Sequence, residues 1–193
     1  VDEGTSDVLP HLATNYYELP ADIRTAGLWH LDEASGSTLA DSSPYGNTAT
    51  ARGTTVTTGK LKKARNFNGT SDNITIPDSA SLRIKQYTVE FWLNAPQQTE
   101  VWKGLVGKTG RNFNVWLGNA NGAAGYIHHR FRDGASYNSG CGDTGNVIQW
   151  NTWNYIAITN DGVTCQTYVN GKLEGSGVVS GTLATDSNII YVG

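Results

Sequence analysis

The stretch GLWHLDEASGSTLAD at residues 27–41, continued by SSPYGN at residues 42–47, is the most informative part of the sequence for the fold. It opens with a short apolar segment at residues 28–31, which is followed by Asp32 and by a Ser-Gly-Ser turn. The loop Asp-Ser-Ser-Pro-Tyr-Gly-Asn at residues 41–47 then supplies a proline, a glycine and short polar side chains, which are typical of tight turns. A short apolar segment bounded by such turns predicts a β-strand rather than a helix.

The rest of the chain repeats this pattern of short strands and turns. Asn-Gly and Asp-Gly pairs, such as those at residues 170–171 and 161–162, allow the positive φ angles that tight hairpins need. No long stretch has helical periodicity, and residues 78–82 are expected to form one helical turn with Asp78 or Ser79 as its cap. We therefore expect strands at residues 26–31, 47–51, 63–68, 72–76, 86–95, 103–108, 111–118, 124–132, 146–149, 153–160, 163–170, 172–178 and 188–192.

Alternation along these strands divides their side chains between two faces, because successive residues of a strand point in opposite directions. The inward set should fill the space between two sheets stacked about 10 Å apart. The fold class that we predict is all-β, a sandwich of two antiparallel sheets. The side chains expected to point inward are Val89, Phe91, Leu93, Phe113, Val115, Leu117, Ile127, His129 and Phe131.

Length and composition limit the possible functions of the chain. Its 193 residues are enough for one domain with a two-sheet core, and a net charge of −3 argues against a broad basic surface for nucleic acid. No apolar run approaches the roughly 20 residues of a membrane span. Abundant glycine and tyrosine together with 16% charged residues fit a secreted or cell-surface β-protein. In that setting Cys141 and Cys165 are expected to form a disulfide that stabilises the fold by about 3 kcal/mol; the alternative is two unpaired thiols.

Residues 1–25 differ from the rest of the chain. Pro10 and Pro20 bracket the segment HLATNYYEL, which has no clean periodicity. We expect residues 1–25 to be an N-terminal extension or arm, and residues 26–193 to be the sandwich domain. The arm can act as a tether, or its Tyr16 and Tyr17 can dock onto a neighbour.

The order of several motifs resembles the laminin-G-like modules of the concanavalin A-like lectin/glucanase superfamily. The motifs are the stretch at residues 27–47, RNFNGTSDNITIPDSASL, YTVEFWLNA, WNTWNYIAITNDG and YVNGKLEGSG. The resemblance covers roughly residues 26–193 and implies a jelly-roll sandwich that binds sugars or protein partners outside the cell. It also implies a closing strand with an Asp-Glu pair after residues 189–192, beside residues 28–31, and the sequence given has no such strand.

Three explanations for the closing strand stay open. The sequence is clipped after Gly193, or residues 1–25 fill the gap, or another subunit donates a strand. The last would make the chain a structural or adhesive subunit of a filament, surface layer or virion, because an open edge pairs readily with another chain.

A calcium site is the first candidate for bound chemistry. Ca²⁺ prefers six to eight hard oxygen ligands, and the loop at residues 41–47 concentrates such oxygens. Similar modules often bind a structural Ca²⁺ here, and the expected ligands are Asp32, Asp41 and Asn47. The alternative is that Asp41 caps a turn and Asn47 takes a left-handed conformation.

A sugar-binding platform is the second candidate. Trp92, Trp116, His128 and Arg130 are expected on one sheet face by alternation, where flat rings suit the apolar faces of pyranoses and the cations donate to hydroxyls or carboxylates. The alternative is that these aromatic rings lie under long loops as a second core.

Catalysis is the least favoured class. Glycosidases of this sandwich need a carboxylate pair, and the Glu-x-Asp-x-x-Glu type of strand run is missing from the sequence. Tyr126, His128 and Arg130 resemble the groups of a polysaccharide lyase, but the strand motifs of the alginate-lyase type do not occur. We therefore predict a non-catalytic, extracellular module that binds a glycan or other cell-surface ligand, with Ca²⁺ as its expected cofactor and a homo-oligomer or filament neighbour as the alternative partner.

Overall fold

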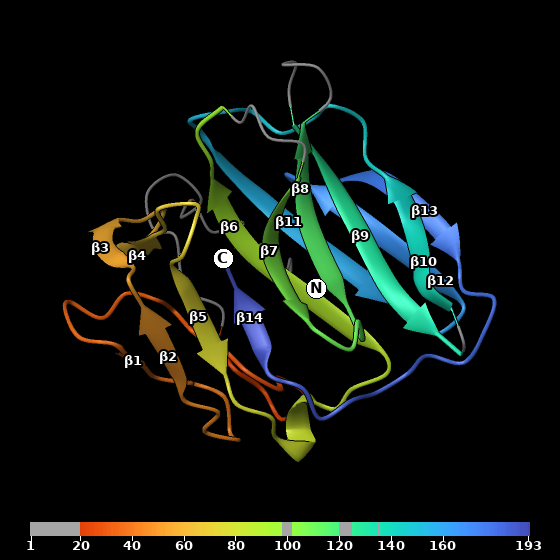
Figure 1. Ribbon diagram of the computed structural model, residues 1–193, viewed down its shortest axis with the longest axis horizontal. Helices are drawn as coiled ribbons and strands as arrows, with labels where there is room; N and C mark the ends of the chain where they lie inside the picture. Colours follow the sequence, from red (N-terminus) through yellow and green to blue (C-terminus); the bar gives the residue numbers. More distant parts are fainter. Residues whose placement is uncertain (1–19, 98–101, 120–124, 135) are drawn as a thin grey trace, which may run out of the picture.

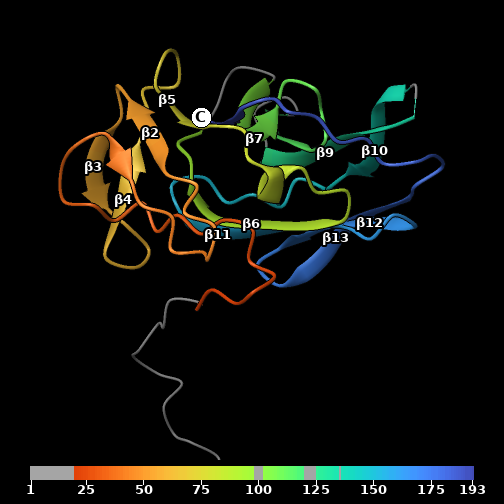
Figure 2. The ribbon, with the colours of Figure 1, turned by 90° about the horizontal axis from the view of Figure 1, so that it is seen from below.

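The computed structural model describes residues 20–97, 102–119, 125–134 and 136–193 of the chain. Within these residues the chain forms strands and one short 3₁₀ turn, η1 (Ala80–Leu82), in the segment where one helical turn was expected. Two antiparallel sheets lie face to face (Figures 1 and 2), so the predicted all-β jelly-roll sandwich is confirmed. No helix in the described part of the chain is long and apolar enough to cross a membrane.

The larger sheet lies in front in Figure 1 and has eight strands. From one edge to the other they are β1 (Thr38–Leu39), β2 (Ala49–Arg52), β5 (Asn73–Ile76), β14 (Ile190–Val192), β7 (Trp102–Lys108), β8 (Asn114–Asn119), β9 (Gly125–Asp133) and β10 (Ser136–Asp143).

The smaller sheet lies behind it and has four strands, with a separate hairpin at one end of the molecule (Figure 2). The sheet order is β13 (Lys172–Val178), β12 (Thr164–Val169), β11 (Trp153–Asn160) and β6 (Tyr87–Asn94), and the hairpin joins β3 (Thr55–Thr58) to β4 (Lys63–Asn66).

The core between the sheets follows the predicted alternation. On β9 every second residue is buried, so Ile127, His129 and Phe131 point inward while His128 and Arg130 point outward. On β8 the side chains of Val115 and Leu117 are buried in the same way, and Phe113 is buried just before the strand; on β6 the expected inward set is only partly buried.

Several polar side chains are buried, and His129 is a titratable one among them. His129 is fully buried, and its Nε2 atom lies 2.9 Å from the hydroxyl of Tyr87, which comes from the opposite sheet. Burial, with smaller contributions from the charges of Arg130 and His128, lowers the pKa of His129 to about 3, so the ring is neutral in the folded protein.

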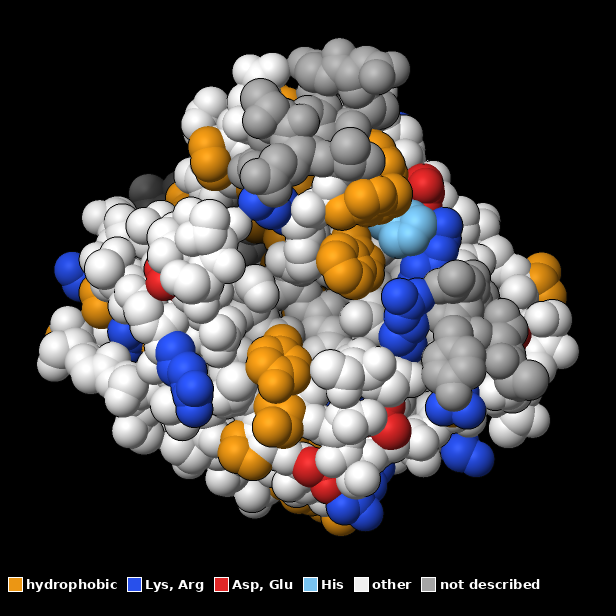
Figure 3. Space-filling view, in the orientation of Figure 1, with side chains coloured by type: hydrophobic (Ala, Val, Ile, Leu, Met, Phe, Trp, Pro, Cys, Tyr) orange, Lys and Arg blue, Asp and Glu red, His pale blue; other side chains and the backbone are white. Residues whose placement is uncertain are grey.

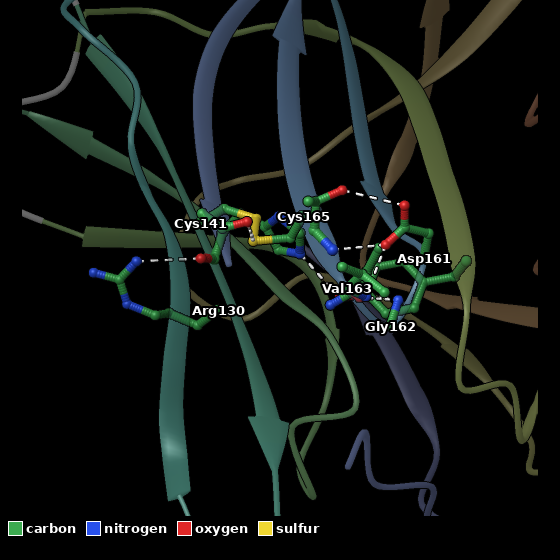
Figure 4. Close-up of a disulfide and its surroundings, with 11 residues drawn as sticks. Arg130, Cys141, Asp161, Gly162, Val163 and Cys165 are labelled. Carbon is green, nitrogen blue, oxygen red and sulfur yellow. Dashed lines mark hydrogen bonds between the residues drawn. A yellow bond between two sulfur atoms is a disulfide. The ribbon is translucent and has the colours of Figure 1, made fainter. Parts of the chain in front are cut away.

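The predicted disulfide between Cys141 and Cys165 is present and joins β10 to β12, and so links the two sheets (Figure 4). Both half-cystines are fully buried, in a small second core with Phe131, Val179 and Leu183. The turn just before β12 is held by Asp161, whose carboxylate accepts hydrogen bonds from the backbone N–H groups that follow it.

The expected strand at residues 26–31 is wrong. These residues pair with no described strand, because side chains take the backbone bonds that a ladder would use: the Leu28 N–H donates to the carboxylate of Asp41 at 2.8 Å. Leu31 also has a positive φ of 59°, which no regular strand contains. The segment still packs on the core through Ala26, Trp29 and Leu31.

Other boundaries also differ from expectation. Residues 146–149 contribute only an isolated bridge between Ile148 and Gly125, and the sequence pattern missed β1, β3 and β10. In the described residues β6 pairs with β11 on one side and leaves its other edge unpaired. Residues 1–19 lie outside the described part, so the extension, the domain division at residue 25 and the three explanations for the closing strand stay predictions.

Candidate functional site

Glycines face aromatic side chains across the middle strands of the eight-stranded sheet. Trp116 on β8 lies opposite Gly104 on β7 and opposite His128 on β9. Tyr191 on β14 lies opposite Gly107 on β7. A glycine inside a strand often marks a place where a ligand approaches the backbone, so this pairing of large and absent side chains produces a recess.

The recess is a groove of about 340 Å³ on the outer face of the sheet. Trp116 and Tyr191 line it together with Asn114 and Arg111, and β7 supplies Gly104 and other backbone to it. The register between β7 and β8 shifts after Gly104, and such irregularities are common beside binding sites. Hydrophobic side chains gather on this face beside basic ones (Figure 3).

A cluster of rings adjoins the groove. The Trp102 ring stands edge-on to Tyr126, with centroids 5.6 Å apart, and edge-on to His128 at 4.5 Å. The Tyr126 ring covers Gly118, where any Cβ atom would lie 2.2 Å from it. Trp102 keeps 42% of its surface exposed, so the cluster still presents an aromatic face to solvent.

A carboxylate ties two predicted site residues together. One oxygen of Asp143 on β10 lies 2.5 Å from His128 Nδ1 and 3.3 Å from the Arg130 guanidinium. Arg130 lies opposite Gly140 on β10, where any side chain would collide with the guanidinium. Figure 4 shows Arg130 beside Cys141, the residue that follows Gly140. Burial and the charge of Arg130 lower the pKa of His128, against the opposing effect of Asp143.

The structure therefore brings Trp116, His128 and Arg130 onto one face, as predicted. The expectation that Trp92 shares that face is wrong, because β6 belongs to the other sheet and Trp92 lies on the opposite side of the sandwich. Alternation along a strand assigns a residue to a face but does not say which sheet the strand joins. There Trp92 contacts the Tyr155 ring, with centroids 5.1 Å apart.

The loop predicted to bind calcium is organised by Asp41. Its carboxylate accepts hydrogen bonds from the N–H groups of Leu28, Ser43 and Asn47 and from the Ser43 hydroxyl, at 2.7–2.8 Å. Burial raises the pKa of Asp41, but these hydrogen bonds outweigh it and bring the pKa below its ordinary value. Asp41 thus caps the loop, as the alternative proposed, while the positive φ falls on Gly46 rather than on Asn47.

The other two expected ligands are also engaged. The Asp32 carboxylate pairs with Lys62 at 3.3 Å, and the Asn47 amide donates to Ala26 and Ser81. Among the described residues no three His, Cys, Asp or Glu side chains converge in a way that fits a metal ion. These donors fit Ca²⁺ poorly in this arrangement, and the calcium ion itself stays a prediction.

Three contributors to the site were not indicated by the sequence pattern: Gly104, Tyr191 and the ring of Trp102. The spacing KGLVGK at residues 103–108 was the available signal, since two glycines within one strand are unusual. Their alignment with Trp116 and Tyr191 depends on the register, which the sequence does not state.

Two stacked antiparallel sheets with an aromatic groove on an outer face define a β-sandwich of the concanavalin A-like class. The sequence model of the Laminin_G_3 family, described as the concanavalin A-like lectin/glucanases superfamily, matches residues 68–193. This match spans more than half of the chain, so the chain belongs to that family. A search of curated proteins finds no match.

Solved structures support the same fold. Domain 4 of AbnA, a GH43 extracellular arabinanase from Geobacillus stearothermophilus in complex with arabinotriose, is 21% identical with a TM-score of 0.63 over 80% of this chain and 77% of that one. The binding domain of botulinum neurotoxin serotype C1 is 12% identical with a TM-score of 0.67, over 89% and 43%. The binding domain of botulinum neurotoxin DC in complex with SialylT is 12% identical with a TM-score of 0.64, over 89% and 44%. The chain therefore spans less than half of either toxin domain.

Proposed function

We propose that this chain is a non-catalytic, extracellular carbohydrate-binding module whose glycan lies in the groove on the outer face of the eight-stranded sheet. The observation that carries the proposal is the pairing of Trp116 with Gly104, which leaves this ring beside open backbone, while the ring of Tyr191 lines the same groove. A pyranose ring can stack its C–H face on such a ring while its hydroxyls reach polar groups. Asn114 and Arg111 supply those polar groups at the groove.

The relatives make glycans the first ligand class to test. The arabinanase domain was solved with arabinotriose and the DC toxin domain with SialylT, and each resembles this chain in fold alone. The disulfide between the sheets supports an oxidising, extracellular setting. A calcium ion would act by bracing the loop at residues 41–47, remote in sequence from the groove strands.

The chain offers a matched pair of variants to test the site. Trp116→Ala removes a ring from the groove, while Trp92→Ala removes the same ring from the opposite face. We expect glycans identified on an array to lose binding to the Trp116 variant by about ten- to a hundredfold, and to keep binding to the Trp92 variant. If only Trp92→Ala lost glycan affinity, the binding site would lie on the four-stranded sheet instead. A wild-type chain that binds no neutral or acidic glycan would refute the proposal.

One observation favours a second function, a structural or adhesive subunit. Within the described residues the β6 edge of the four-stranded sheet is unpaired, and such an edge accepts a strand from a neighbour. Light scattering on the purified chain and electron microscopy of native material test this alternative. A stable monomer across a wide concentration range would exclude self-assembly through that edge.

A further inference from the structure

Two arginines flank the groove from different elements. Arg111 lies in the turn between β7 and β8 and lines the groove directly. Its φ is +58°, a left-handed conformation that costs a side chain about 1 kcal/mol relative to glycine. Backbone strain of this kind often accompanies a functional side chain.

Arg130 reaches the same face from β9, where it lies opposite the groove residue Asn114. Its guanidinium donates to the backbone oxygen of His129 at 3.2 Å and pairs with Asp143. A guanidinium has five N–H donors in a planar fork, so these two contacts leave donors for a ligand.

The two guanidiniums act on a common region of the surface. Burial is the main cause that lowers the pKa of His128, but the charges of Arg130 and Arg111 both contribute. Asp143 is the carboxylate that opposes them there. Two guanidinium charges therefore act near His128 against the single carboxylate of Asp143, whereas the whole chain carries a net charge of −3.

A contact within the chain illustrates the kind of group that these donors bind. A single carboxylate oxygen of Asp143 already bridges the His128 imidazole and the Arg130 guanidinium. A ligand with an anionic oxygen would meet the same kind of donors at the groove, and charge-assisted hydrogen bonds of this type are the strong ones.

We infer that the groove selects an anionic glycan, whose carboxylate or sulfate group binds between Arg111 and Arg130 while its ring stacks on Trp116. This inference rests on the proposed glycan-binding function. Arg111 supplies the direct contact, and Arg130 adds positive potential and a second donor. The side-chain oxygen of Asn114 can accept from a hydroxyl, because its amide nitrogen donates to the backbone oxygens of Phe113 and Lys108.

The test uses one oligosaccharide in two forms. Calorimetry measures the affinity of the whole chain for an oligogalacturonate and for the same oligomer with its carboxylates reduced to alcohols. We expect the acidic form to bind about tenfold tighter or more at low salt, and the difference to shrink as sodium chloride is added. In a third arm, the affinity for a sulfated derivative of a neutral oligosaccharide is measured, which shows whether the site prefers a carboxylate or a sulfate.

Matched variants locate the effect. Arg111→Gln keeps a polar side chain and should remove most of the preference for the acidic form, and Arg130→Gln should reduce it. Arg52→Gln is the control, because Arg52 lies exposed on β2 of the same sheet, three strands from β7 in the sheet order, and should leave the preference unchanged.

The outcomes separate the two proposals. Equal affinity for the acidic and reduced forms in the wild-type chain overturns the anionic specificity and leaves glycan binding intact. A preference for the acidic form that Arg111→Gln does not diminish also overturns it. Failure to bind glycans of any charge refutes the proposed function itself. Release of an unsaturated uronate, detected by its ultraviolet absorbance, would show that the protein cleaves the bound glycan. The proposed binding function would then be replaced by lyase activity.

Discussion

Replacing both half-cystines by alanine, Cys141→Ala with Cys165→Ala, removes the covalent link between the two sheets. The disulfide joins residues 24 apart in sequence, and its Cα atoms are 5.5 Å apart. It sits in the small second core beneath β9, so the perturbation acts on folding and leaves the groove residues themselves unchanged.

The expected loss of stability can be worked out from the loop that the disulfide closes. In the chain-entropy account, a loop of about 25 residues corresponds to about 3.5 kcal/mol at 25 °C. The two missing sulfur atoms leave space beside Phe131 and Leu183, which adds on the order of 1 kcal/mol. The sum is a large share of the roughly 5–15 kcal/mol that stabilises a typical domain.

Urea unfolding followed by tryptophan fluorescence measures the loss. Three samples are compared: the oxidised wild type, the wild type in a reductant, and the double alanine variant. The reduced wild type keeps both sulfur atoms, so its shift isolates the effect of the cross-link from that of the lost volume. Equal unfolding midpoints for all three samples would refute the reasoning.

Three further perturbations test other parts of the structure. The neutral, buried His129, with a pKa near 3 in the folded state against about 6.5 unfolded, binds fewer protons folded than unfolded between these values. The unfolding free energy should therefore fall by up to about 1.4 kcal/mol per unit as the pH drops from 6.5 toward 5, and His129→Gln should flatten that slope in pH-dependent urea titrations. Asp41→Ala leaves several N–H donors without their acceptor and should cost about 3 kcal/mol in the free energy of unfolding. Melting of the wild type with EDTA and with added Ca²⁺ tests the predicted ion: a higher melting temperature with Ca²⁺ would favour the calcium site, and coinciding curves would count against it. Gly104→Ala should raise the melting temperature and lower glycan affinity, because the open space above this glycine belongs to the groove.

The sequence correctly predicted the features that follow from local patterns, namely which side chains of a strand point inward and where a tight hairpin turn lies. The alternation on residues 127–131 placed His129 inside and His128 outside, and the structure agrees because each strand is half-buried on one sheet face. The hairpin at residues 170–171 has positive φ at both residues, as its Asn-Gly pair indicated.

Features that depend on long-range pairing could not be predicted in this way. Trp92 was assigned to the wrong face because sheet membership depends on which strands pair, not on residue type. Residues 26–31 have a strand-like pattern, yet the Asp41 side chain takes the Leu28 N–H. The Ser136–Asp143 strand contains small and polar residues of low β-propensity, and it is ordered by its pairing with β9.

The glycines around the groove do not all have the same reason to be there, and the difference bears on function. At Gly118 a Cβ atom would lie 2.2 Å from the Tyr126 ring, and at Gly107 it would lie 2.5 Å from the Asn114 side chain, so packing alone explains both. At Gly104 it would meet nothing closer than the Trp116 ring at 3.9 Å, so packing does not require a glycine.

A glycine inside a strand costs roughly 0.5–1 kcal/mol relative to alanine, and at Gly104 the folded structure gains no packing in return. The space above this residue is part of the groove, so a ligand that needs the backbone there would account for the glycine. Gly104→Ala should then stabilise the chain by roughly 0.5–1 kcal/mol in urea unfolding while it weakens glycan binding several-fold in calorimetry. A variant that is more stable and binds as tightly as the wild type would show that the open space beside Trp116 serves no ligand.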